Sequence, residues 1–156
     1  MKILVVIKSK HQGNTQKIAE AMAEVAPVTI TMLEDVKNYK LSEYDIVGFG
    51  SGIYFGKHDK ELLKFVEGVC DKKAYSFVFS TSGTKSFEKN NSALVKLLES
   101  KNKVVLGSFG CQGLDKFFIF KLGGGLNKNH PDMEDFEAAQ QFILDVIKKY
   151  NKLTAQ

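Results

Sequence analysis

Short apolar runs alternate along the chain with stretches whose apolar residues recur at helical spacing. Five runs rich in Val, Ile and Phe predict strands at residues 2–7, 28–32, 45–50, 74–79 and 103–107. Four of them are apolar almost throughout, as expected of strands that a parallel sheet covers on both faces. The run at 28–32 alternates apolar and polar residues, which favours a strand at an edge of the sheet.

Four helices are predicted at residues 15–25, 60–69, 92–99 and 132–150, because the apolar residues of each fall on one side. The link at 33–42 is short and carries no clear helical pattern. This alternation predicts an α/β fold, a doubly wound five-stranded parallel sheet inside a three-layer sandwich. A common strand order for such sheets is 2-1-3-4-5. The length of 156 residues fits a single domain spanning 1–156.

Composition narrows the function classes. All 22 basic residues are lysine and the net charge is +4, so the arginine forks that read nucleic acid are missing. We therefore expect no nucleic-acid partner.

The three histidines share no spacing typical of metal ligands, and we expect no metal. Cys70 and Cys111 lie far apart, which fits reduced thiols in the cytoplasm. No apolar stretch is long enough to span a membrane, and residues 1–7 are too short for a signal peptide.

The first candidate site is the loop Ser9–Thr15 between the first strand and the first helix. Its glycine lets the backbone approach a ligand, and the helix start offers N–H groups with partial positive charge. Together they form an anion site that would suit a phosphate. The alternative is an ordinary helix cap made by Asn14 or Thr15.

Two further loops follow the third and fourth strands, at the edge of the sheet where the first loop also lies. In the loop 50–58, the aromatic pair Tyr54 and Phe55 could stack on a flat ligand, or could pack onto the core. In the loop 80–84, small hydroxyl residues and Gly83 leave N–H groups free for the polar edge of a ligand, or simply make a turn.

The three loops resemble those of the flavodoxin family. Gly13-Asn14-Thr15 resembles the family's phosphate loop, and residues 50–54 and 81–84 resemble its two loops beside the flavin ring. The resemblance implies a noncovalent FMN and a small soluble electron-transfer protein that exchanges electrons with a reductase or a ferredoxin-type partner. The residues it implies at the cofactor are Ser9, Lys10, His11, Gln12, Gly13, Asn14, Thr15, Ser51, Gly52, Ile53, Tyr54, Phe55, Gly56, Thr81, Ser82, Gly83 and Thr84.

The chain departs from the family pattern in three ways. Lys10 stands where a hydroxyl residue is usual, so a cation or Ser9 would replace one phosphate donor. No tryptophan is present, which leaves Tyr54 as the stacking residue. The chain is basic where relatives are acidic, and we expect a less negative final reduction potential, because nearby positive charge stabilises an anionic reduced flavin. A flipped peptide near flavin N5 would fall at Gly52 or Gly56.

A second function remains open at this stage, because the segment 114–126 is longer than a plain carrier needs. Its run Phe117–Phe120 lies between Lys116 and Lys121, and could cover the flavin, dock a partner, touch a membrane surface or pack in the core. This segment and the run Tyr54–His58 loosely resemble the menaquinone-dependent protoporphyrinogen oxidase branch of the same superfamily, which implies an FMN-dependent oxidoreductase. A module that binds no flavin is the third alternative.

Single residues outside the loops add little. His58 could relay a proton or be an exposed loop histidine, and Cys111 is expected to be a small buried residue. No arrangement of nucleophile and base is recognisable, so no catalytic residue is assigned.

Overall fold

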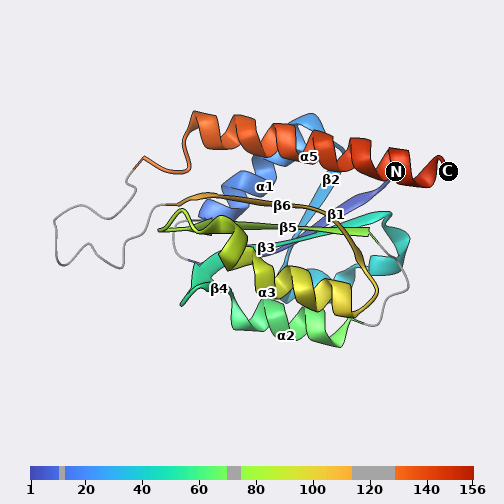
Figure 1. Ribbon diagram of the computed structural model, residues 1–156, viewed down its shortest axis with the longest axis horizontal. Helices are drawn as coiled ribbons and strands as arrows, with labels where there is room; N and C mark the ends of the chain where they lie inside the picture. Colours follow the sequence, from blue (N-terminus) through green and yellow to red (C-terminus); the bar gives the residue numbers. More distant parts are fainter. Residues whose placement is uncertain (11–12, 70–74, 114–128) are drawn as a thin grey trace.

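A parallel sheet forms the centre of the chain in a computed structural model, which describes residues 1–10, 13–69, 75–113 and 129–156. Its strands are β1 (Ile3–Lys8), β2 (Val28–Met32), β3 (Ile46–Tyr54), β5 (Tyr75–Ser82) and β6 (Val104–Gln112). They lie in the order β2-β1-β3-β5-β6, and the two-residue strand β4 (Lys57–His58) pairs antiparallel with the end of β3 (Figure 1). The predicted order 2-1-3-4-5 is confirmed, with the second strand at an edge.

Helices cover both faces of the sheet, which confirms the predicted three layers. The helices α1 (Asn14–Val25) and α5 (Met133–Thr154) lie on one face, and α2 (Lys60–Gly68) and α3 (Phe87–Ser100) on the other (Figure 1). The link after β2 holds only two short 3-10 helices, η1 (Leu33–Asn38) and η2 (Leu41–Glu43). Within the described ranges, no helix has both the length and the apolar character needed to cross a membrane.

Each face of the sheet has its own hydrophobic core. On the α1 and α5 side, Ile18 and Met22 pack with Ile143 against alternate residues of the strands. On the other side, Leu62 of α2 and Leu94 of α3 cover the intervening strand residues. All five residues of the central run Ile3–Ile7 are fully buried, as expected for a strand covered on both faces.

Two glycines of β3 make room for aromatic rings from the neighbouring strand. A Cβ at Gly48 would lie 2.2 Å from the ring of Phe77, and one at Gly50 would lie 2.3 Å from the ring of Phe79. The two rings therefore lie across β3 where any larger residue would clash. This packing fixes the register that brings the ends of β3 and β5 together.

The strands extend past their predicted ends at one edge, the left side of Figure 1. There Lys8 pairs with Ser51, Ser51 with Ser80, and Thr81 with Cys111. The apolar pattern missed these extensions because polar residues and glycines such as Lys8, Ser51 and Ser80 interrupt it there, yet their backbones continue the ladder. The helix predicted at 92–99 likewise begins earlier, at Phe87, because its first turns are polar. The edge gathers the loops that the sequence singled out.

Candidate flavin site

No side chain among the described residues caps the first turn of α1. Its N-cap residue is Gly13, in the left-handed region at φ 67°, and no acidic side chain lies in the first turn. The Oγ atom of Ser9 is buried without a hydrogen-bond partner within the described part of the chain. Helix N–H groups without a side-chain cap, next to a buried hydroxyl without a described partner, could donate to an anionic group such as a phosphate. His11 and Gln12, which the sequence places in this loop, lie outside the described residues.

The predicted helix cap is not made by Thr15. Its side chain is buried, and its Oγ1 atom lies 3.0 Å from Oγ1 of Thr81, the residue that begins the third loop. Gly113, after β6, packs on the same turn, since a Cβ there would lie 2.8 Å from Nδ2 of Asn14. The first loop is thus in contact with the ends of β5 and β6.

Lys10 reaches from the first loop to the second. Its Nζ atom lies 2.7 Å from a carboxylate oxygen of Asp59 and 5.3 Å from the centre of the Tyr54 ring. The hydrogen bond to Asp59 raises the pKa of Lys10. Burial acts to raise the pKa of Asp59, but Lys10 and the N–H of Glu61 hold it below its ordinary value. Lys10 is therefore paired with a carboxylate in this structure.

A second ion-pair group lies beside this contact. Lys8, at the end of β1, pairs with both Glu34 and Glu61, and the two contacts raise its pKa. With Lys10 and Asp59 included, two lysines face three carboxylates. The group as a whole carries one net negative charge.

The second loop is a hairpin of β3 and β4. Tyr54 pairs with Lys57, and the turn between them has Phe55 at φ 52° and Gly56 at φ 77°, as in a type I′ turn. Tyr54 is half-buried and lies close to the Cα of Gly52, where a Cβ would come within 3.0 Å of its hydroxyl oxygen. Phe55 is fully exposed at the tip, with 106% relative exposure. The predicted aromatic pair therefore divides, one ring toward Lys10 and one toward solvent.

His58 is buried, so the alternative of an exposed loop histidine is wrong. It is only 2% exposed, and its ring atoms Nδ1 and Nε2 lie 2.8 Å from Ser51 Oγ and 2.8 Å from Asn91 Oδ1. Burial lowers its pKa to about 4, despite the opposing effect of the Asn91 hydrogen bond. Asn91 and Asp59 were not predicted as part of the site. Asn91 could have been noticed as one of two adjacent amide residues, Asn90 and Asn91, directly before the predicted helix 92–99.

The third loop is held at both of its ends. Thr81 and Ser82 are buried, the Ser82 hydroxyl donates to the carbonyl oxygen of Thr84, and the Ser82 carbonyl accepts from the N–H of Gly113. Gly83 and Thr84 reach the surface. Cys111 is buried, as expected.

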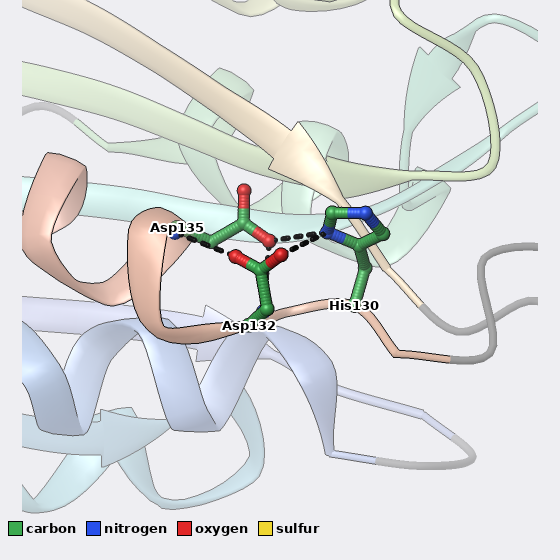
Figure 2. Close-up of side chains that lie close together, drawn as sticks. All are labelled: His130, Asp132 and Asp135. Atoms are coloured by element: carbon green, nitrogen blue, oxygen red, sulfur yellow. Dashed lines mark hydrogen bonds and ion pairs between the residues drawn. The ribbon is translucent and has the colours of Figure 1, made fainter.

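One group of side chains near this edge has the composition of a cation site. The ligand atoms of His130, Asp132 and Asp135 lie within 4.8 Å of one another (Figure 2). Asp132 accepts from the N–H of Asp135, Asp135 accepts from the N–H of Asp132, and His130 Nδ1 lies 2.6 Å from Oδ2 of Asp135. That contact raises the pKa of His130. These bonds form a capping box at the start of α5, and we interpret the group as a helix cap.

The comparisons with known proteins agree with this fold. A family model described as a flavodoxin domain matches residues 4–143. An uncharacterized protein of Methanocaldococcus jannaschii is 40% identical over 149 residues, covering 95% of this chain and 99% of that protein. A flavodoxin structure from the domain Archaea aligns with a TM-score of 0.70 at 20% identity, covering 97% of this chain and 99% of that one. A Streptococcus pneumoniae flavodoxin gives 0.68 at 18% identity, with 96% and 99% covered.

Proposed function

The chain belongs to the flavodoxin family, and from this premise we propose that it binds one FMN noncovalently and carries electrons between redox proteins. The observation that supports this most is the uncapped first turn of α1 beside the buried Ser9 hydroxyl, at the edge that Tyr54 also lines. A ligand with a phosphate at one end and a flat ring at the other matches these two features.

The phosphate would lie on Ser9 and on the turn Gly13–Thr15. His11 and Gln12 are assigned there by the family resemblance alone. The ring would lie between the hairpin residues 51–56 and the third loop, 81–84, with Tyr54 as the stacking residue. FMN supplies the electron transfer when bound, and the protein's part is to bind the ring, orient it and limit its contact with water.

Lys10 takes a different role from the one expected of a phosphate donor. Its ammonium group is occupied by Asp59, so we propose that it joins the first loop to the hairpin. The pairing also bears on the reduction potential. We expected a less negative final potential from the basic sequence, but Lys8 and Lys10, at the end of β1 and in the first loop, are neutralised by carboxylates. The local charge therefore gives that expectation little support.

The peptide that could flip near the flavin is better sought at Gly56 than at Gly52. Gly52 belongs to β3 and pairs with Thr81 of β5, which holds its peptide in the ladder. Gly56 lies in the turn at positive φ, where glycine changes conformation at little cost.

The alternative of a quinone-linked oxidoreductase rests on residues 114–126 and on the run Tyr54–His58. The hairpin that holds Tyr54–His58 makes no described contact that favours that function, and residues 114–126 lie outside the described residues. Phe117–Phe120 as a membrane or partner contact stays a sequence prediction for the same reason. For the carrier we propose a reductase or ferredoxin-type donor as partner, with no nucleic acid, and a cytoplasmic location.

The test is to purify the chain with added FMN and follow the visible spectrum through gel filtration and stepwise reduction. We expect one flavin per chain and reduction in two separate one-electron steps. Turnover of a quinone or a porphyrinogen would instead favour the enzyme. Protein that retains no flavin would contradict the proposed function.

A further inference from the structure

His58 lies at the buried end of a hairpin whose tip is fully exposed. The hairpin ladder has only two residue pairs, Ile53 with His58 and Tyr54 with Lys57. A ladder this short has little stability of its own. What holds the hairpin in place must therefore come from side chains at its base, and His58 is the hairpin residue buried there, at 2% exposure.

The hydrogen bonds around His58 define its tautomer. Asn91 donates through Nδ2 to Oγ of Ser108 at 2.8 Å and to the carbonyl oxygen of Phe109 at 2.9 Å. A carbonyl can only accept, so the amide of Asn91 must present Oδ1 to His58. Nε2 of His58 then carries the proton and donates to that oxygen, and Nδ1 is left as an acceptor.

Ser51 completes the bridge on the other side of the ring. Its hydroxyl lies 2.8 Å from Nδ1 of His58 and can donate there, although the carbonyl oxygen of Gly52, at 2.7 Å, is a second acceptor within reach. The same Oγ accepts from the N–H of Asp59 at 3.0 Å. We call the three residues Ser51, His58 and Asn91 the His58 bridge. It connects β3, the hairpin and the first turn of α2 with α3 and β6.

We propose that His58 is a positioning residue of the flavin site: as the Nε2–H tautomer it fixes the hairpin that carries Tyr54 and so sets the affinity for the flavin ring. The inference rests on the proposed function, because it names the ring as the group that Tyr54 meets. The bridge contacts neither Ser9 nor Gly13 in any bond described above. Its loss should therefore weaken binding of the ring and leave the contribution of the phosphate unchanged.

The first experiment needs no ligand. Nitrogen NMR of the His58 imidazole should show a protonated Nε2 and an unprotonated Nδ1 at neutral pH. Hydrogen exchange of the backbone amides of the hairpin should become about tenfold faster in His58→Phe, which keeps a ring but leaves Asn91 Oδ1 without its donor. Asn91→Ala breaks the bridge from the other side and serves if His58→Phe does not fold. The opposite tautomer, or unchanged exchange in both variants, would overturn the role of His58.

The second experiment separates the ring from the phosphate. Dissociation constants for riboflavin and FMN should both rise about tenfold in His58→Phe, while their ratio stays that of the wild type. Damage that also reaches the phosphate contacts at the first turn of α1 would change the ratio and contradict the proposal, and so would equal affinity to the wild type. A general loss of folded protein would raise both constants by the same factor, and the free energy of unfolding of the variant, measured in urea, shows whether that occurs. Thr31→Val, which removes a buried hydroxyl of β2, is the matched control and should bind as the wild type does. If the wild type binds neither ligand, the proposed function fails, and the tautomer and the exchange rates still decide whether His58 fixes the hairpin.

Discussion

Two parts of the same sheet edge differ in whether their polar groups have hydrogen-bond partners. At the start of α1, no side chain caps the first turn and the Ser9 hydroxyl is buried without a described partner. At the start of α5, Asp132 and Asp135 cap each other's N–H groups and hold His130 beside them (Figure 2). The His58 bridge is closed in the same sense, because the ring nitrogens of His58 both have partners.

The difference separates a part of the edge whose polar groups satisfy one another from the part where we propose that the phosphate binds. Buried polar groups normally find partners inside the fold, since an unpartnered one costs about 1–3 kcal/mol. The closed parts avoid that cost by themselves. The open part would avoid it on binding the phosphate that we propose, and residues 9–17 contain no carboxylate that would repel such a group.

The largest effect is expected from placing a carboxylate in the first turn of α1, where α5 has two and α1 has none. Asn14→Asp adds one negative charge to the first turn with almost no change of shape. At a separation of about 5 Å and an effective dielectric near 20, repulsion of a phosphate amounts to about 3 kcal/mol, or roughly a hundredfold in affinity. Calorimetric titration should show this loss for FMN and little change for riboflavin.

The matched control for that change is Asn102→Asp, which follows α3 at the opposite edge of the sheet. It makes the same replacement of amide by carboxylate and should leave both affinities as they are. Equal losses for riboflavin and FMN in Asn14→Asp would mean that the first turn of α1 does not hold the phosphate.

The stability that the His58 bridge contributes should depend on pH. The folded-state pKa of His58, about 4, lies below its ordinary value of 6.5, so the unfolded chain takes up a proton first as the pH falls. The stability that depends on neutral His58 is complete above pH 6.5 and is lost as the pH falls toward 4. The loss amounts to about 3 kcal/mol. Urea unfolding at a series of pH values measures it, and in His58→Phe the free energy of unfolding should fall much less over this window.

The sequence was a good guide to the fold and a partial guide to the site. Strands such as Ile3–Lys8 could be predicted because burial on both faces demands an unbroken apolar run. The hairpin could not, because Lys57 and His58 make a strand of two residues with no periodicity to detect. The His58 bridge joins residues 51, 58 and 91, whose proximity depends on the packing of α3 against the sheet. No local pattern records such a contact, which is why the sequence left His58 open between a proton relay and an exposed loop histidine.

A smaller effect tests the cap of α5. In Asp135→Asn the ion pair with His130 is lost, and the pKa of His130 should move back toward its ordinary value, because the Asp135 contact is the main cause of its rise. A raised folded-state pKa stabilises the fold below the unfolded pKa and ceases to do so as the pH rises through the folded value. The variant should therefore lose stability at acid pH more than at alkaline pH, by about 1 kcal/mol or less in this exposed setting. NMR titration of His130, with His58 as an internal reference, measures the shift, and an unchanged pKa would contradict the cap as described.

The smallest expected effect concerns Phe55, which lies at the tip of the hairpin between the open and closed parts. A phenylalanine at φ 52° pays a backbone cost of about 1 kcal/mol that asparagine tolerates better, and its ring is fully exposed. Phe55→Asn should therefore raise the free energy of unfolding by about 0.5–1 kcal/mol, or the melting temperature by a few degrees. Gly56→Ala, at φ 77°, should do the reverse. The flavin affinity of Phe55→Asn then shows whether Tyr54 alone, or Phe55 as well, contacts the flavin ring. An unchanged value leaves stacking to Tyr54 alone, whereas a tenfold loss, about 1.4 kcal/mol, would mean that Phe55 closes over the ring when the ligand binds.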